Sequence, residues 1–185
     1  DLDVGLLVYN AAFAPIGTFL SVPLQDRLKI LDVNCRAPVI LLDHFAGRMV
    51  ARGGGGLLLM SSMSGWQGSG HVGTYAASKA FLLVLGESLW YELQASKIDV
   101  LVCVAGATST PGFEGSTSED KRAGAFPMRP EDVAVGALDH LTSGPTYIPG
   151  AVNQVVHAVF SRLLPRRTAV RFMSGKTRQM YGDKG

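Results

Sequence analysis

Apolar residues occur along this chain either in short runs or at helical spacing, and the two patterns alternate from its first residues to its last. Three short apolar runs are typical of strands buried on both faces, at residues 4–8, 57–61 and 98–104. Segments with helical spacing follow them, at residues 23–50, 74–95 and 130–141. A short strand near Tyr147 and two helical segments complete the chain. Strands that alternate with helices form βα units, so the sequence predicts an α/β fold with a parallel sheet.

No linker divides this pattern. The 185 residues are enough for one hydrophobic core, so we expect a single domain over residues 1–185. Within it, residues 151–185 are expected to form a helical C-terminal extension. The first strand begins within four residues of Asp1, and no methionine precedes it. Because a strand buried on both faces needs neighbours, we expect that N-terminal βα units are missing from this segment.

Composition and charge exclude several classes of protein. Apolar residues make up 47% and charged residues 17%, which indicates a globular chain. A net charge of +2 is too small to suggest a nucleic-acid partner. The basic excess lies in the tail, where residues 160–185 hold seven Lys or Arg and one acid. That tail is either a solvated helix face or a surface for an acidic partner, a phosphate-bearing substrate or a membrane surface.

Cysteine and histidine usage adds two expectations. Cys35 and Cys103 are isolated, which fits reduced thiols in a cytoplasmic protein better than a disulfide framework. The four histidines show no metal-ligand spacing, so we expect no metal site. No apolar run reaches the length of a membrane span, and no signal-peptide pattern stands at the start.

Tyr75 and Lys79 are the residues that suggest chemistry. They lie four positions apart on a predicted helix, so their side chains share one face. A phenol has a reference pKa of about 10, and a nearby ammonium should lower it enough for acid–base work. Ser62 ends the second strand and could donate a hydrogen bond to the same substrate oxygen. The spacing alone arises readily by chance, and Tyr75 could also be an ordinary half-buried helix residue.

The surrounding motifs resemble those of the classical short-chain dehydrogenases/reductases. Tyr75-Ala-Ala-Ser-Lys79 resembles the YxASK signature of that family, in which a serine lies thirteen residues before the tyrosine, as Ser62 does here. Asn34 matches the asparagine of the catalytic tetrad. Residues 9–12 resemble the NNAG element, and residues 105–110 resemble the PGxxxT segment. The motifs occur in the family's order over residues 1–150.

The resemblance implies a Rossmann-type, doubly wound parallel sheet in three layers, and an NAD or NADP cofactor. Its implied catalytic residues are Asn34, Ser62, Tyr75 and Lys79. Its implied cofactor-binding residues are Asn10, Ala11, Ala12, Tyr75, Lys79, Gly106, Thr108 and Thr110. It also implies a homodimer or homotetramer, with the helix of residues 74–95 at the interface.

Asn34 has a further reason to be special. Pro38 lies four residues later in the helical pattern and cannot donate to the Asn34 carbonyl, so that carbonyl is released from the helix ladder. In the family the freed carbonyl holds a water that leads to the lysine, which makes a proton relay. The alternative is an ordinary proline kink with Asn34 facing solvent.

Several positions depart from the family pattern. Tyr9 replaces an Asn and Ala12 a Gly of NNAG, and Ala105 replaces the Pro of PGxxxT. The glycine-rich phosphate-binding turn of the family, TGxxxGxG, does not occur in these residues. The residues that choose between NAD and NADP are not among them either.

The resemblance places the substrate beside Ser62 and Tyr75, under the loop of residues 110–128. Four residues are candidates for an apolar lining or for core anchors: Trp66, Phe113, Phe126 and Met128. Residues 115–124 are polar and could act as a lid. A bulky, lipophilic ketone or alcohol would suit this lining.

Two functions remain open. The first is an NAD(P)-dependent oxidoreductase that interconverts a carbonyl and an alcohol on a small molecule, with Tyr75 as general acid and base. The second is a truncated, cofactor-free relative that acts as a binding or scaffold protein. A glycine-rich turn upstream would favour the first.

Overall fold

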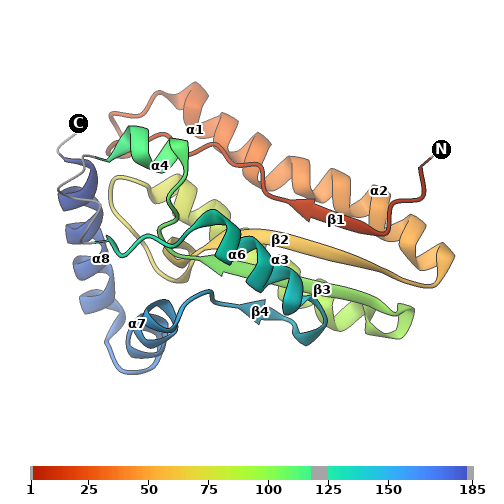
Figure 1. Cartoon of the computed structure of the whole chain (residues 1–185). Helices are drawn as coiled ribbons and strands as arrows, with labels where there is room; N and C mark the ends of the chain where they lie inside the picture. The colour runs from red at the N-terminus through yellow and green to blue at the C-terminus, as the bar shows by residue number, and fades with distance from the viewer. Residues whose placement is uncertain (1, 118–124, 183–185) are drawn as a thin grey trace.

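The computed structural model describes residues 2–117 and 125–182. In this part of the chain, four strands form one parallel sheet in the order β1-β2-β3-β4. The strands are β1 (Leu6–Tyr9), β2 (Gly55–Ser62), β3 (Ile98–Ala105) and β4 (Thr146–Tyr147). All four run the same way, so their carboxyl ends meet at one edge of the sheet (Figure 1). The predicted parallel α/β sheet is confirmed.

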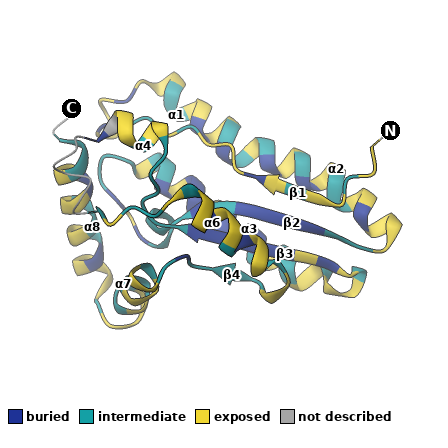
Figure 2. Cartoon of the chain, viewed as in Figure 1, coloured by how far each residue is buried: buried dark blue, intermediate teal, exposed yellow. Residues whose placement is uncertain are grey.

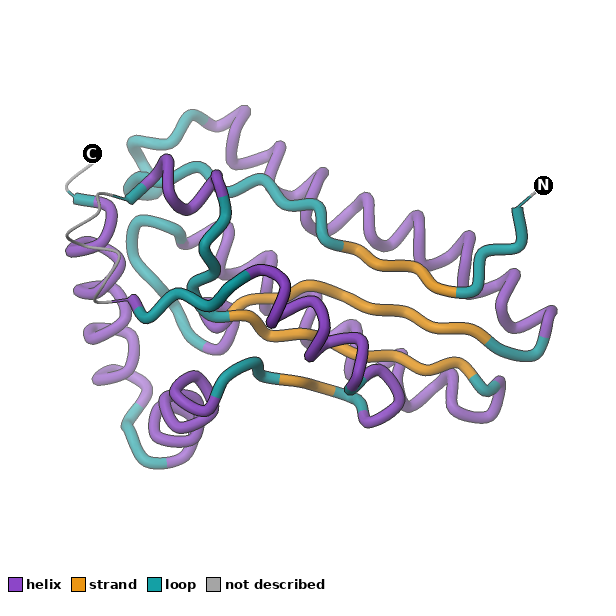
Figure 3. The backbone as a smooth tube through the Cα atoms, viewed as in Figure 1, coloured by secondary structure: helices purple, strands orange, loops and turns teal. Residues whose placement is uncertain are grey.

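Helices cover both faces of the sheet. The helices are α1 (Leu24–Leu31), α2 (Ala37–Arg52), α3 (Gly73–Leu93), α4 (Pro111–Ser116), α6 (Pro130–Asp139), α7 (Ala151–Arg162) and α8 (Arg166–Tyr181). Figure 3 shows α1 to α3 behind the sheet and α6 in front of it. The predicted three-layer, Rossmann-type architecture is therefore confirmed, and α7 and α8 form the two expected terminal helices.

Alternate side chains of β2 enter the hydrophobic core on opposite faces of the sheet. Leu57 and Leu59 pack with α2 and α3, whereas Leu58 packs with Val133 and Ala137 of α6. Figure 2 shows β2 and β3 as the most continuously buried elements. Helix α3 lies so close to the sheet that a Cβ on Gly86 would be 2.2 Å from a methyl carbon of Val102. Gly86 therefore sets the distance between this helix and β3.

Three details differ from the sequence pattern. β1 pairs only with β2 among the described strands, and Leu6 and Val8 on it are exposed, so it is not buried on both faces. The irregular stretch of residues 105–129 contains α4, which Thr110 caps by accepting a hydrogen bond from the Phe113 amide at 3.3 Å. The predicted lid lies largely in residues 118–124, outside the described part.

The long helical pattern of residues 23–50 is interrupted, as Pro38 predicts. Residues Asp32–Arg36 form a π-helical turn between α1 and α2, in which the Ala37 amide bonds to the Asp32 carbonyl. Within the described residues, no helix has both the length and the hydropathy that a membrane crossing requires.

Candidate active site

The hydroxyl groups of Ser62 and Tyr75 meet at the carboxyl edge of the sheet. Ser62 ends β2, and Tyr75 lies in the first turn of α3. Residues 63–72 connect the two elements. The Ser62 hydroxyl is close enough to the Tyr75 phenol to lower the pKa of that phenol. Ser62 Oγ also accepts hydrogen bonds from the Ser64 amide at 3.2 Å and the Ser64 hydroxyl at 3.0 Å. The 3-10 turn of residues Met63–Trp66 thus holds Ser62 in place.

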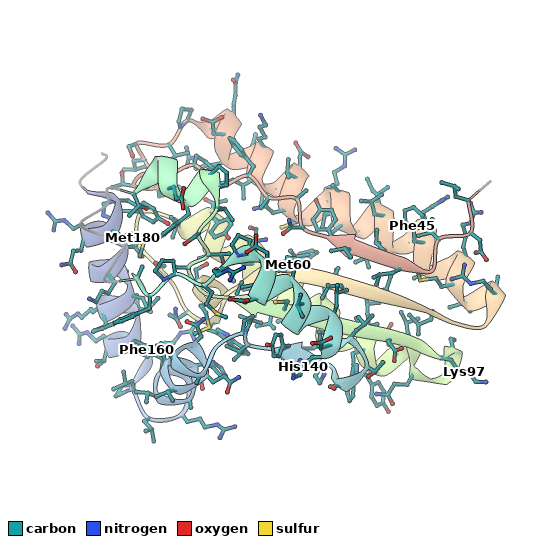
Figure 4. The ribbon with its side chains drawn as sticks, viewed as in Figure 1. Phe45, Met60, Lys97, His140, Phe160 and Met180 are labelled. Atoms are coloured by element: carbon teal, nitrogen blue, oxygen red, sulfur yellow. The ribbon has the colours of Figure 1, made fainter. Side chains whose placement is uncertain are left out.

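Lys79 lies one turn further along α3, on the face of Tyr75. Its Nζ atom is 5.6 Å from the centroid of the Tyr75 ring. It donates a hydrogen bond to the Met60 carbonyl oxygen at 2.7 Å, and Met60 lies near the carboxyl end of β2 at the centre of Figure 4. The predicted juxtaposition of Ser62, Tyr75 and Lys79 is therefore present.

Burial dominates the electrostatics of this group. It raises the pKa of the Tyr75 phenol above 10.0; the Ser62 hydroxyl acts in the opposite direction, and the nearby Tyr181 adds to the rise. Burial also lowers the pKa of Lys79 to about 8, against a smaller opposing effect of Cys35. The pKa of Tyr75 is raised overall, with burial as the largest cause, so the predicted lowering of this pKa does not appear in the structure. Tyr75 is a phenol that holds its proton, which suits a general acid.

Asn34 is fully buried, so the alternative in which it faces solvent is wrong. Its Oδ1 accepts a hydrogen bond from the Phe13 amide at 2.8 Å, and its Nδ2 donates to the Phe13 carbonyl at 3.0 Å. Nδ2 also donates to Ser78 Oγ at 2.9 Å, and that hydroxyl donates to the Tyr75 carbonyl at 2.7 Å. The Asn34 side chain therefore connects the segment after β1 to the helix that carries Tyr75 and Lys79.

The residues expected to bind a cofactor lie along the same edge. Asn10, Ala11 and Ala12 follow β1 and are exposed. Gly106 and Thr108 follow β3, and Thr110 comes next as the cap of α4. The carboxyl edge of an open parallel sheet is where such folds bind ligands.

The donors at this edge fit a nicotinamide cofactor. An ammonium has three N–H donors, and the Met60 carbonyl takes one from Lys79, which leaves two for the hydroxyls of a ribose. Ala11 and Ala12 carry only methyl side chains, so a ligand can approach the backbone there. Among the described residues, no group of His, Cys, Asp and Glu could hold a metal ion.

The expected apolar lining is only partly found. Trp66 is half-buried, and its ring lies tilted against that of His157, with ring centroids 4.2 Å apart. Met128 packs instead against the core on the α6 side, and Phe126 is 70% exposed. These positions do not support the predicted lining role of the two residues, and Met128 also pairs with Thr108 through an isolated bridge.

Tyr181 is the residue that the sequence did not indicate. It ends α8, yet its phenol is near enough to Tyr75 to raise the pKa of that residue. Burial also raises the pKa of Tyr181 itself. No motif marks Tyr181; only the position of α8 across the carboxyl edge of the sheet brings it there (Figure 1).

Known proteins share both the sequence pattern and the fold. The family model of the short chain dehydrogenases matches residues 2–121, more than half of the chain. A 7beta-hydroxysteroid dehydrogenase of Clostridium sardiniense is 32% identical over 154 residues, which cover 83% of this chain and 59% of that protein. The chain thus spans about three fifths of the length of this relative.

Two solved structures show the same arrangement. A 7beta-hydroxysteroid dehydrogenase superposes with a TM-score of 0.83 at 25% identity, over 93% of this chain and 67% of that one. A putative NAD(P)-dependent gluconate 5-dehydrogenase of Beutenbergia cavernae, with bound NADP, superposes with a TM-score of 0.69 at 29% identity. That alignment covers 75% of this chain and 58% of the other.

Proposed function

This chain belongs to the short-chain dehydrogenase family, and we propose that it is an NAD(P)-dependent oxidoreductase that interconverts a carbonyl compound and an alcohol. The observation that carries the proposal is the proximity of the Ser62 and Tyr75 hydroxyl groups beside the buried ammonium of Lys79. A hydroxyl pair of this kind can bind one substrate oxygen and transfer a proton to it. The cofactor, when bound, supplies or accepts the hydride.

In the direction of reduction, Ser62 donates a hydrogen bond to the substrate carbonyl oxygen and Tyr75 gives that oxygen its proton. The negative charge that develops on Tyr75 lies near the Lys79 ammonium, which stabilises it. Lys79 also binds the cofactor ribose, and the Asn34 carbonyl connects Lys79 to solvent for reprotonation. Alcohol oxidation uses the same groups in reverse. Gly106, Thr108 and Thr110 would hold the nicotinamide end of the cofactor, and residues 10–12 would also contact the cofactor.

The substrate we propose is a hydroxysteroid or a ketone of similar bulk. The support is the likeness to 7beta-hydroxysteroid dehydrogenases over 83% of the sequence and 93% of the structure. We also propose that α3 pairs with a second copy of the chain, because Phe81 and Val84 on it are exposed.

Titration of the intact protein with NADH and with NADPH, followed by fluorescence, tests the proposal. Binding of at least one cofactor is expected. The Tyr75→Phe variant should then bind the cofactor with unchanged affinity and lose turnover of a 7-hydroxysteroid by about 10³-fold or more, since it removes the proton donor. The matched control is Tyr91→Phe, on the exposed face of the same helix.

Two results would count against this assignment. Full turnover in the Tyr75→Phe variant would show that another group transfers the proton. Binding of neither cofactor would favour the second candidate, a cofactor-free binding or scaffold protein.

A further inference from the structure

A cavity of about 350 Å³ lies between the turn that follows β2 and the two C-terminal helices. Ligand pockets in proteins commonly measure about 300–1,000 Å³, so this space is sufficient for a small organic molecule. Six of its lining side chains are largely apolar: Met63, Trp66, Val156, Phe160, Leu164 and Met173. Phe160 lies where α7 meets α8 (Figure 4). Ser62 and Tyr75 are not among the lining residues, so the cavity is separate from the hydroxyl pair.

Helix α8 forms one wall of the cavity. Hydrogen bonds join it to the segment of residues 63–72, which connects β2 to α3. Arg166 donates a hydrogen bond to the Trp66 carbonyl at 2.7 Å, at the first turn of α8. Two turns later the Ser174 hydroxyl accepts one from the Gly70 amide at 2.9 Å. A Cβ on Gly70 would lie 3.2 Å from the Ser174 Cβ, so the helix and the connection are in close contact. The cavity is therefore enclosed by elements that hold one another in place.

The charge around the cavity is positive. Arg166 is part of its lining, and none of the described lining residues is acidic. Arg162, the last residue of α7, is close enough to His157 to lower the pKa of that imidazole. Burial lowers this pKa more strongly. Residues 151–181, which make up α7, α8 and their connection, contain no Asp or Glu at all. An anion in the cavity would meet the guanidinium group of Arg166 and no carboxylate from these helices.

The contacting rings of Trp66 and His157 add hydrogen-bonding capacity to the apolar wall. The nitrogens Nε1 of Trp66 and Nδ1 of His157 are buried, and neither has a hydrogen-bond partner among the described residues. A buried polar atom without a partner is unfavourable, so a ligand that offers it one is bound more tightly.

We propose that this cavity binds an amphipathic anion, with its apolar body between α7, α8 and the turn after β2, and its anionic group on the guanidinium of Arg166. The basic tail is then neither a merely solvated helix face nor a surface for a macromolecule. It supplies the charged end of a small-molecule site that lies next to the proposed proton-transfer group and is distinct from it.

Two fluorescent probes of the same shape test this. One is 8-anilinonaphthalene-1-sulfonate, which is anionic, and the other is its uncharged analogue N-phenyl-1-naphthylamine. Both are expected to bind the intact protein at one site. Arg166→Met should weaken binding of the sulfonate by about three- to tenfold more than binding of the uncharged probe, because loss of the bond to the Trp66 carbonyl affects both probes and loss of the charge affects only the sulfonate. Arg166→Lys, which keeps the charge, should lose less.

Two further variants complete the test. Arg171→Met removes an exposed charge from the same helix outside the cavity, and it should change the binding of neither probe. Val156→Trp fills the cavity and should abolish the binding of both. Thermal unfolding of each variant verifies that the fold is retained.

Three outcomes would overturn the proposal. They are equal losses in the Arg166→Met and Arg171→Met variants, retained binding in Val156→Trp, and failure of the wild-type protein to bind either probe. Because the titrations contain no NADH or NADPH, these results are independent of the proposed oxidoreductase activity.

Discussion

The Nζ atom of Lys79 donates a hydrogen bond to the Met60 carbonyl oxygen at 2.7 Å, and so ties the second turn of α3 to β2. A second bond runs between the same elements, from Ser61 Oγ to the Lys79 carbonyl at 2.8 Å. Lys79 is therefore both a proposed active-site cation and part of the packing between helix and sheet. Its side chain is 3% exposed, and burial lowers its pKa to about 8. Holding a charge here has a cost in folding free energy.

Replacement of Lys79 by Met should remove this cost. The fall in pKa from 10.5 to about 8 corresponds to about 3 kcal/mol of destabilisation at neutral pH. The substitution also leaves the Met60 carbonyl without its hydrogen bond, and this loss reduces the gain in stability by about 1–2 kcal/mol. We therefore expect Lys79→Met to raise the free energy of unfolding by about 1–2 kcal/mol at neutral pH, and to abolish turnover. Urea unfolding and steady-state assays measure the two effects.

The same shift sets a pH dependence of stability. Between about pH 8 and pH 10.5 the unfolded chain binds a proton on Lys79 that the folded protein has released, so wild-type stability should rise with pH in this range. The Lys79→Met variant should lack that rise, whereas Lys176→Met, at an exposed position of α8, should keep it. Parallel curves for all three proteins would show that Lys79 does not carry an altered pKa.

Asn34 should be a residue on which both folding and catalysis depend. Its side chain makes three hydrogen bonds, two to Phe13 and one to Ser78, and all of its atoms are buried. Asn34→Ala leaves the Phe13 backbone groups unpaired, so we expect a loss of about 2–4 kcal/mol in chemical unfolding.

Ser78→Ala is the matched control for Asn34. It removes the bond from Nδ2 and the bond that Ser78 donates to the Tyr75 carbonyl, but it leaves both bonds to Phe13, so it should cost about 1–2 kcal/mol. If proton delivery uses the Asn34 carbonyl, Ser78→Ala should keep the solvent isotope effect of the wild-type enzyme. A stability loss in Ser78→Ala as large as that in Asn34→Ala would contradict the assigned roles.

The sequence predicted the parts of this site that follow from local pattern. The apolar run of residues 57–61 and the helical spacing after Thr74 locate Ser62 and Tyr75 at a strand end and a helix start. Parallel strands place such positions on one edge whatever the side chains are. The π-turn before Pro38 could likewise be anticipated, because proline removes a backbone donor wherever it stands.

What the sequence could not predict depends on packing between distant segments. The raised pKa of Tyr75 results from burial, which no spacing encodes. Tyr181 reaches the site because Ser174 and Thr177 bond to Gly70 and Ser69, more than 100 residues away in the chain. Thr110 before Pro111 is a sequence signal for the start of a helix. The glycines at residues 112 and 115 weaken that signal, so α4 was not predicted.

Gly86 should be intolerant of any side chain. A Cβ there would lie 2.2 Å from Val102 Cγ2 and 3.1 Å from Leu59 Cδ1, both in the buried core. Gly86→Ala should therefore destabilise the protein by about 1–3 kcal/mol, despite the better helix propensity of alanine. Gly47→Ala on α2, where nothing lies within 4 Å of the new Cβ, should instead be neutral or stabilising. Val102→Ala should relieve the clash in the double variant, and additive losses would show that α3 is not fixed at this distance.

Tyr181 should tune the proton transfer from a distance. Its phenol is one of the causes that raise the pKa of Tyr75, and phenylalanine keeps the ring but removes the group that can ionise. Tyr181→Phe should therefore shift the pH–rate profile of alcohol oxidation, which needs the Tyr75 phenolate, toward lower pH. The KM for the cofactor should not change, and Tyr91→Phe, on the exposed side of α3, should leave the profile where it is. A Tyr181→Phe profile that coincides with the wild type would show that α8 does not act on Tyr75, whereas a shift to higher pH would mean that Tyr181 stabilises the phenolate by a hydrogen bond.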